Sequence, residues 1–386
     1  MKSYVSDVVK ELPPSGIRKF FDIATEIEDA ISLGVGEPDF VTPWNIREAA
    51  IHCIDKGRTH YTSNRGMTEL RELIEKYLMD RFKVSYSAKN MVITVGASEA
   101  LDLAFRAICN PGDEILIPAP SYVSYEPGVK LAGGVPVAVE TFDKDAFILT
   151  PEELEKAITP KTKAIVVPYP NNPTGAIMTR EQLDAIVPLL RRHNILILAD
   201  EIYAELTYGG NHASIAKGNE DMTVLINGFS KAFAMTGWRL GYAAGPKEII
   251  DAMVKIHQYS MLCAPIMSQA AGIEALSYEM GNGYQQVEDM RRSYNRRRTL
   301  ILDKFSELGL PCFEPKGAFY AFPNVSGTGL SSEDFCTKLL YSKSVAVVPG
   351  TAFGKCGAGF VRFSYAASVE NIVEAMRRIG EFLEEL

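Results

Sequence analysis

The chain has 386 residues, of which 47% are hydrophobic and 23% charged, and its formal net charge is -8. This length exceeds what one hydrophobic core usually supports, so we expect a large domain and a smaller one. The composition excludes a disordered or fibrous protein, and the acidic balance argues against nucleic acid as a partner. No run approaches the roughly 18 apolar residues that span a bilayer, so we expect a cytoplasmic protein with no membrane segment.

Cysteine and histidine usage indicates no metal and no disulfide framework. The six cysteines are scattered and form no CxxC pair, which is typical of reduced, mostly buried thiols. The five histidines show no ligand spacing, and we assign them no role.

Short apolar runs alternate with longer amphipathic stretches from about residue 90 onward. The runs are MVITVG (91–96), DEILIPAP (113–120), KAIVVPYP (163–170), NILILAD (194–200), TVLING (223–228) and RLGYAAG (239–245). Continuous apolar runs of this length are typical of strands buried on both faces. The pattern predicts an α/β fold with a mostly parallel sheet covered by helices.

The character of the sequence changes past residue 285. A long Arg-rich helical stretch at 288–309 precedes short apolar runs such as GAFYAFP (317–323) and FVRFSYA (360–366). We interpret this part as a smaller α+β domain, and we expect the N-terminal segment to pack either with it or across the active site. The predicted large domain therefore covers residues 46–284, and the smaller one covers 1–45 and 285–386.

Polar residues follow several of these runs, at the edge of the sheet where open α/β folds bind ligands. Gly96-Ala97-Ser98-Glu99 opens a helix after the first run, and free N–H groups there suit a phosphate. The turn NNPTG at 171–175 is by itself an ordinary surface turn. Asp200 ends a buried strand, where an ionised carboxylate is costly unless a cation or hydrogen-bond donors face it.

An Asp-Glu pair after a strand also occurs in nucleotide hydrolases, but the GxxxxGK[ST] loop that they need is absent from this sequence. Lys231 offers a different chemistry, because it lies in GFSKAFAMTGW with hardly another charge nearby. A desolvated lysine with a lowered pKa is a nucleophile for carbonyl carbons.

Together these motifs resemble a known family. The runs NNPTG (171–175), ADEIY (199–203) and SKAFAMTGWRLGY (230–242), at these separations, resemble the fold-type-I pyridoxal-phosphate aminotransferases, in the branch of aspartate and aromatic aminotransferases. The resemblance extends from LGVGEPDF (33–40) to VRFSYA (361–366). It implies a large domain with a mostly parallel seven-stranded sheet, a smaller α+β domain, and pyridoxal 5'-phosphate as the cofactor.

The resemblance assigns roles around the cofactor ring. It implies that Lys231 binds the cofactor as a Schiff base and later moves the substrate proton, and that Asp200 pairs with the protonated pyridine nitrogen. Asn172 and Tyr203 would hydrogen-bond the phenolic oxygen of the ring. Tyr122 would stack on the ring face, and a core aromatic residue is the less favoured alternative for this position.

The resemblance also implies how the phosphate is held. The backbone N–H groups of Ala97 and Ser98, the hydroxyl of Ser230 and the guanidinium of Arg239 would surround it. Tyr61 looks like the family tyrosine that reaches the phosphate of the neighbouring subunit. A homodimer with shared active sites follows from this resemblance.

For the substrate, the key residue is Arg362, which lies in an apolar strand where an unpaired guanidinium is expensive. Its natural partner is the α-carboxylate of an amino acid. The backbone of Gly36 is expected to contact the same carboxylate. Tyr122 and Asn172 would complete the substrate side of the site.

Three positions depart from the family pattern. Aspartate-specific members often have lysine where this chain has Ser98 and tryptophan where it has Tyr122. Aspartate, aromatic and diaminopimelate-type amino donors therefore stay open. Gly228 replaces a serine that many relatives use to bind the phosphate.

Arg65 and Arg18 fall in segments that line the substrate side chain in relatives, although such arginines are more often surface residues.

The main interpretation is a ping-pong aminotransferase with 2-oxoglutarate as the acceptor. A C–S β-lyase with the same cofactor and fold is the alternative, because the residues around the cofactor do not decide which bond at Cα breaks. A pyridoxal-phosphate-sensing regulator would carry a DNA-binding domain before the motifs, and only some 30 residues precede them here.

Overall fold

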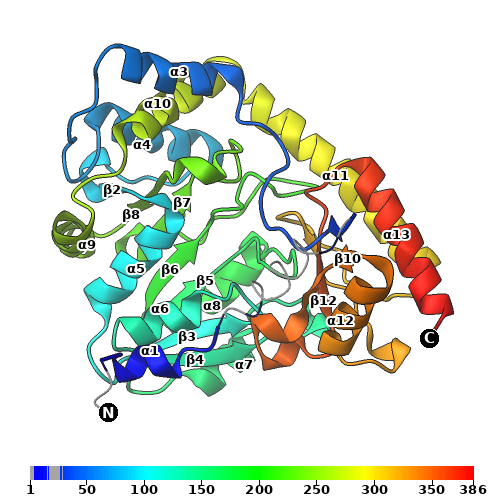
Figure 1. The fold of residues 1–386 in the computed structure, drawn as a ribbon. Helices are drawn as coiled ribbons and strands as arrows, with labels where there is room; N and C mark the ends of the chain where they lie inside the picture. The colour runs from blue at the N-terminus through cyan, green and yellow to red at the C-terminus, as the bar shows by residue number, and fades with distance from the viewer. Residues whose placement is uncertain (1–3, 15, 17–26, 28) are drawn as a thin grey trace.

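The computed structural model describes residues 4–14, 16, 27 and 29–386, and its centre is a seven-stranded sheet (Figure 1). The strand order is β2-β8-β7-β6-β5-β3-β4. Strand β8 is antiparallel to both of its neighbours, and every other pair is parallel. The bounds are β2 (Met91–Thr94), β3 (Glu114–Ala119), β4 (Val135–Glu140), β5 (Thr162–Val167), β6 (Leu196–Asp200), β7 (Thr223–Gly228) and β8 (Gly241–Ala244). The predicted mostly parallel sheet is confirmed.

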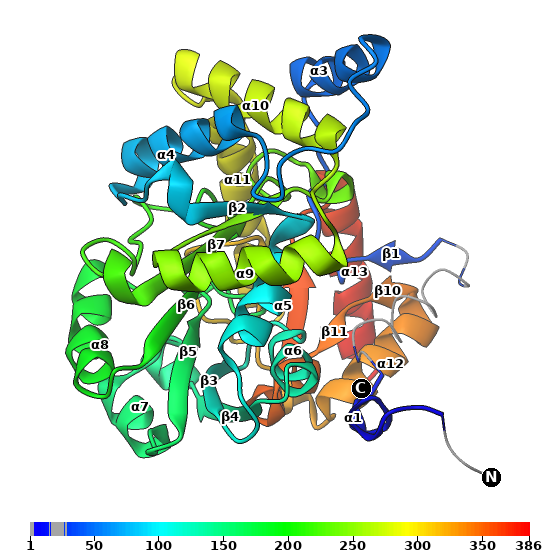
Figure 2. The same cartoon turned by 90° about the vertical axis from the view of Figure 1, so that its left-hand side faces the viewer.

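Helices cover both faces of this sheet, because successive side chains of a strand point to opposite faces. In β6, Ile197 and Ala199 pack into one hydrophobic cluster and Leu198 into another. Figure 2 shows the second face, with α5, α6 and α9 in front of the strands. The bounds on that face are α5 (Gly96–Ile108), α6 (Tyr125–Leu131) and α9 (Lys247–Ser260). On the opposite side lie α4 (Thr68–Phe82), α7 (Pro151–Ala157), α8 (Arg180–Arg192) and α10 (Ile266–Gly281), with α3 (Trp44–Asp55) on α10.

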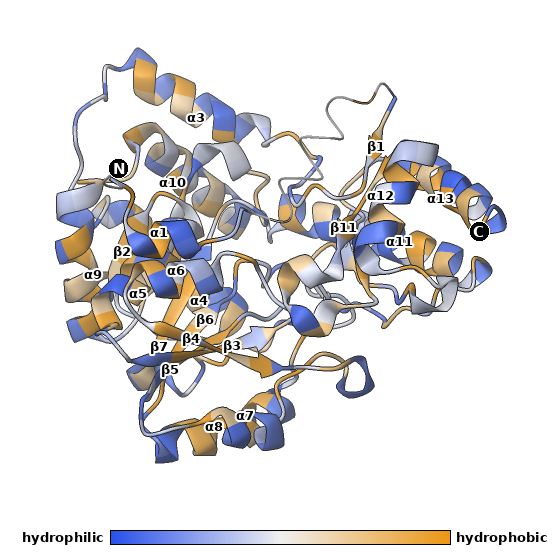
Figure 3. Cartoon of the chain, turned by 60° about the horizontal axis from the view of Figure 1, so that its bottom comes forward, coloured by the Kyte–Doolittle hydropathy of each residue, from blue (hydrophilic) through white to orange (hydrophobic). Residues whose placement is uncertain are grey.

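The hydropathy of the chain follows this layering. The strands are coloured as hydrophobic in Figure 3, whereas the surrounding helices carry both hydrophilic and hydrophobic stripes. Helix α8 illustrates the local signals: Thr179 accepts a hydrogen bond from the backbone of Gln182, whose side chain accepts one from the backbone of Thr179. This capping box satisfies donors that a helix start otherwise leaves free.

The rest of the chain forms a second, smaller group of elements, seen to the right in Figure 1. Strands β11, β12 and β9 form an antiparallel sheet, and β1 pairs in parallel with β10. The bounds are β1 (Ile31–Ser32), α11 (Gln285–Glu307), β9 (Tyr320–Ala321), α12 (Ser332–Lys343), β10 (Val345–Ala346), β11 (Val348–Pro349), β12 (Val361–Ser364) and α13 (Val369–Glu384). The short helix α1 (Asp7–Glu11) contacts α6. The predicted domain boundaries stay predictions.

Among the described residues, no helix combines the length and the apolar character that crossing a membrane requires.

Candidate active site

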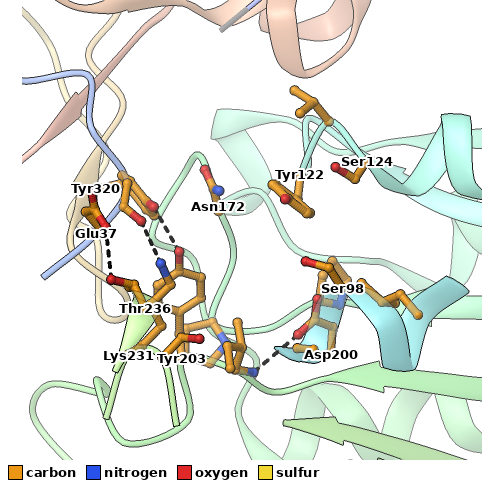
Figure 4. Close-up of a pocket in the computed structure, with 18 of the residues that line it drawn as sticks. Glu37, Ser98, Tyr122, Ser124, Asn172, Asp200, Tyr203, Lys231, Thr236 and Tyr320 are labelled. Carbon is orange, nitrogen blue, oxygen red and sulfur yellow. Dashed lines mark hydrogen bonds between the residues drawn. The ribbon is translucent and has the colours of Figure 1, made fainter. Parts of the chain in front are cut away.

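A cavity of about 760 Å³ lies at the carboxyl ends of the parallel strands (Figure 4). It lies between the large sheet and the smaller group of elements, since its walls include Asp200 at the end of β6 and Arg362 of β12. Every predicted site residue except Tyr61 lines it: Gly36, Ala97, Ser98, Tyr122, Asn172, Asp200, Tyr203, Ser230, Lys231, Arg239 and Arg362. Residues more than 300 positions apart in the sequence therefore share one cavity.

Lys231 points its amine into this cavity. The Nζ atom donates a hydrogen bond to the backbone oxygen of Gly36 at 2.6 Å. A side chain on Gly36 would place its Cβ 2.6 Å from the hydroxyl of Tyr320, so glycine permits this close approach. Burial lowers the pKa of Lys231 to about 8, although the nearby carboxylate of Glu37 opposes the shift. The amine is therefore neutral in a far larger fraction of molecules than an exposed lysine is.

Asp200 ends β6 and is 6% exposed. Burial raises the pKa of this carboxyl to about 6, and hydrogen bonds partly offset the effect of burial. The hydroxyl of Tyr125 donates to Oδ2 at 2.7 Å, and the backbone N–H of Ile202 donates to Oδ1 at 3.3 Å. The site thus holds a carboxylate that a cation in the cavity would stabilise.

Arg362 is fully enclosed at the far wall of the cavity. Its Nη1 donates to Oδ1 of Asn172 at 2.8 Å, and its Nη2 donates to the backbone oxygen of Gly34 at 2.5 Å. The guanidinium lies over the rings of Tyr320 and Phe353, with centroids at 4.6 and 4.8 Å. A guanidinium has five N–H donors, so these bonds leave donors for a carboxylate. Among the described residues, its buried Nε has no hydrogen-bond partner.

The start of α5 and Arg239 form one corner of the cavity. Gly96 has φ +75°, and a Cβ there would lie 2.6 Å from Nη2 of Arg239, so the guanidinium packs directly against the helix start. Glu99 accepts the N–H of Val95 at 2.5 Å, and the first N–H groups of the helix have no intrahelical acceptor. The buried Ser230 lines the same cavity. A helix N-terminus beside a guanidinium suits a phosphate.

Tyr61, and Arg65 whose role the sequence left open, lie away from the cavity. Tyr61 is 82% exposed on the loop between α3 and α4, and its contact with a second subunit stays a prediction. Arg65 forms an ion pair with Asp251 and donates to the backbone oxygen of Lys89 at 3.1 Å, so its guanidinium is engaged outside the cavity. Arg18 falls outside the described residues.

Gly228 has a packing reason for being glycine. It ends β7 opposite Gly241, and a Cβ would lie 2.9 Å from the backbone oxygen of Leu240. The strand pair therefore leaves no room for a serine side chain at this position without a shift of the backbone.

Sequence reasoning missed the two tyrosines that hold the site residues. Tyr125, at the start of α6, bonds Asp200, and Tyr320, in β9, bonds Tyr203 at 2.8 Å. Tyr125 follows Tyr122 in the same segment after β3, so its place beyond a strand end was an available signal. Tyr320 lies within an apolar run that is typical of a buried core strand, and nothing in the sequence singles out its hydroxyl.

The comparisons with known proteins agree with this geometry. The family model described as aminotransferase class I and II matches residues 28–379. A Bacillus subtilis aminotransferase, whose name gives no substrate, is 53% identical over the full length of both chains. The aromatic-amino-acid aminotransferase 2 of Thermococcus litoralis is 44% identical over 99% of this chain and 98% of its own. The structure of aspartate aminotransferase from Thermus thermophilus with maleate is 40% identical, with a TM-score of 0.94 over 99% of this chain and 100% of that one.

Proposed function

The chain belongs to the class I and II aminotransferases, and we propose that it moves the amino group of an L-amino acid with an aromatic or other uncharged side chain to 2-oxoglutarate. The observation that carries this proposal is the shared cavity, in which an amine, a buried carboxylate and an enclosed guanidinium face one space. An amino acid offers complementary groups to such a site.

The cofactor of this family is pyridoxal 5'-phosphate, and the residues of the cavity fit it. In the part of the chain that the structure describes, no cation is bonded to the buried carboxylate of Asp200, which suits a protonated ring nitrogen. The start of α5 with Arg239 is a cradle that a Cβ at Gly96 would fill, which suits the phosphate. Lys231 would hold the aldehyde carbon. When bound, the cofactor supplies an electron sink for the charge left at Cα.

Lys231 and Arg362 act on different groups of the amino acid. Arg362 binds and orients the α-carboxylate, because its remaining donors lie in an enclosed site where bidentate binding is strong. Lys231, with its pKa lowered to about 8 by burial, serves as the base that takes and returns the Cα proton.

The set of cationic residues in the cavity wall favours a substrate whose side chain is uncharged. In the described lining, the cationic residues are Lys231, Arg239 and Arg362, and each already has a role in this proposal. Ser98 and Tyr122 add no charge, and Arg65 is engaged elsewhere. The described lining therefore keeps no unassigned cation for the second carboxylate of aspartate, and the longer 2-oxoglutarate would have to place its distal carboxylate beyond this lining. Diaminopimelate-type donors stay a second candidate.

The test uses the protein loaded with pyridoxal phosphate. We expect absorption in the visible range, its loss on adding phenylalanine or tyrosine, and its return with 2-oxoglutarate. Phenylalanine should react faster than aspartate. The Lys231→Ala variant is the control and should lose the absorption of the covalently bound cofactor. Equal or faster reaction with aspartate would overturn the substrate proposal, and release of ammonia and pyruvate from cystathionine without bleaching would indicate a lyase.

A gain-of-function variant sharpens the substrate test. Ser98→Lys adds a cation at the start of α5 and should raise the rate with aspartate relative to phenylalanine, by about 10-fold if one charged hydrogen bond forms. Ser98→Met has similar length and no charge, so it should leave the ratio unchanged. If both variants change the ratio equally, side-chain size decides specificity at this position.

We also propose that the enzyme is a homodimer with shared sites. The exposed Tyr61 and the exposed apolar residues Trp44, Ile51 and Ile54 of α3 support a subunit interface on this side. The test mixes Tyr61→Phe and Lys231→Ala subunits. If Tyr61 serves the neighbouring site, mixed dimers contain one intact site and regain activity that the separate variants lack. No gain on mixing, with hybrids demonstrated by mass spectrometry, would contradict sharing.

A further inference from the structure

The side chain that holds Asp200 comes from a different element of the fold. Tyr125 begins α6, after β3, whereas Asp200 ends β6, and β5 lies between these two strands in the sheet. Both residues are buried, at 3% and 6% exposure. The Tyr125 ring packs in the hydrophobic cluster beneath α5 and α9 and meets the Tyr122 ring edge-on at 5.6 Å. The phenol is therefore fixed in place before any ligand binds.

The hydrogen bond from Tyr125 is the main support of the Asp200 carboxylate. Within the described part of the chain, the only other donor to this carboxylate is the N–H of Ile202, at the longer distance of 3.3 Å. Two charged groups that face the carboxylate have opposite effects on it: Glu201 disfavours its ionised form, and Lys231 favours that form. A buried carboxylate needs such donors to stay ionised.

We propose that Tyr125 is a positioning residue for amino transfer: its phenol keeps the Asp200 carboxylate ionised and oriented toward the cavity, without touching the reacting atoms. The inference rests on the proposed function, in which Asp200 faces the protonated ring nitrogen of the cofactor. Both Tyr122 and Tyr125 line the cavity, but Tyr122 is predicted to stack on the ring, whereas the hydroxyl of Tyr125 is bonded to Asp200.

The chemistry predicts where the effect of Tyr125 falls. Without the phenol, the carboxylate keeps one weak donor in a buried site, and protonated Asp200 becomes favoured. A neutral carboxyl pairs poorly with a cationic ring nitrogen, so the electron sink weakens. Substrate binding depends on Arg362, which lies elsewhere in the cavity, and should change little.

The test compares Tyr125→Phe with Tyr242→Phe in the loaded enzyme. Both changes remove a buried tyrosine hydroxyl, but among the described residues the Tyr242 hydroxyl has no hydrogen-bond partner. For Tyr125→Phe we expect kcat to fall about 10-fold and KM to stay within about 3-fold, whereas Tyr242→Phe should match the parent.

A spectroscopic readout separates positioning from a merely structural role. With ¹⁵N-labelled pyridoxal phosphate bound, the ring-nitrogen signal should shift toward the unprotonated form in Tyr125→Phe and stay unchanged in Tyr242→Phe. An unchanged signal with an unchanged kcat would overturn the inference, as would equal losses in both variants. If Tyr125→Phe does not fold, fluorinated tyrosine at position 125 keeps the ring, and an unchanged nitrogen signal there would also overturn it.

The failure of this inference is distinct from the failure of the proposed function. If the parent protein shows no visible absorption and no amino transfer, the proposed function fails. If the parent transfers amino groups and Tyr125→Phe behaves like the parent, only the role of Tyr125 fails.

Discussion

The hydroxyl oxygens of Tyr203 and Tyr320 lie 2.8 Å apart in the wall of the cavity. Tyr203 follows β6 in the large sheet, and Tyr320 belongs to β9 in the smaller group of elements. The ring of Tyr320 also lies beneath the guanidinium of Arg362. One side chain therefore joins the predicted ligand of the cofactor oxygen to the predicted ligand of the substrate carboxylate.

This relationship predicts different effects on kcat and KM. Tyr320→Phe keeps the ring under Arg362 and removes only the hydroxyl, so KM for the amino acid should stay nearly constant. Because Tyr203 loses its partner, kcat should fall by roughly 2- to 10-fold, which corresponds to about 0.5–1.5 kcal/mol for one hydrogen bond. Steady-state kinetics check this. The control is Tyr365→Phe, whose hydroxyl makes a 3.3 Å bond outside the cavity.

The close packing of Gly96 against Arg239 predicts loss of cofactor affinity in Gly96→Ala. The new Cβ would lie 2.6 Å from Nη2 of Arg239 and must displace the guanidinium. We expect the Kd for pyridoxal phosphate to rise at least about 10-fold, as for the loss of one charged hydrogen bond.

A second glycine separates that effect from backbone strain. Gly57 has φ +67°, and a Cβ there meets nothing within 4 Å. Gly57→Ala should therefore lose about 1 kcal/mol of stability, as left-handed backbone costs any residue with a Cβ, and keep the parent Kd. If both variants bind the cofactor equally well, Arg239 does not hold the phosphate.

Arg362→Lys tests the recognition of the substrate carboxylate. Lysine keeps the charge but cannot bond Asn172, Gly34 and a carboxylate with one planar fork. We expect kcat/KM to fall about 100-fold, mainly through KM, and cofactor absorption to persist. Arg298→Lys is the matched control, because Arg298 also stacks on a tyrosine and bonds Glu314 away from the cavity. An unchanged KM would assign the carboxylate to another group.

The sequence predicted the fold class and most of the cavity wall because both depend on local patterns. The apolar runs at 163–170 and 194–200 became β5 and β6, and the polar residue after the second, Asp200, lies in the cavity as expected. Resemblance to a known family supplied the chemical roles. The strand pairing explains Gly228, since the space beside Leu240 is a property of two strands and not of either sequence.

Contacts between distant segments could not be predicted in this way. The Arg65–Asp251 ion pair spans 186 positions, and only the packing of α9 beside the loop of Arg65 brings the two together. The bonds of Tyr125 and Tyr320 are likewise set by how whole elements pack. Apolar periodicity places an aromatic ring in the core, but it carries no information on where the hydroxyl points.

Asp200→Asn is predicted to stabilise the cofactor-free protein while abolishing most activity. Burial raises the pKa of Asp200 from its ordinary value of 3.8 to about 6. Between these two pH values, the carboxyl of the folded protein therefore keeps a proton that the unfolded chain has lost. By linkage, ionised Asp200 costs stability, and the cost grows as pH rises from 3.8 to about 6 and is complete above it. At pH 7.5 the variant should be more stable by roughly 1–3 kcal/mol, and at pH 4 the difference should nearly vanish.

Urea unfolding of the cofactor-free proteins at these two pH values measures this difference, and steady-state kinetics of the loaded proteins should show a fall in kcat of about 100-fold or more, as expected for losing a buried charge pair. Asp113→Asn is the control of opposite sign. Its carboxylate bonds Lys163 at 2.6 Å, which lowers the pKa of Asp113, so its replacement should lower stability slightly at pH 7.5. If Asp200→Asn is instead less stable than the parent at pH 7.5, the carboxylate is stabilised within the folded chain itself and does not await a cation from the cofactor.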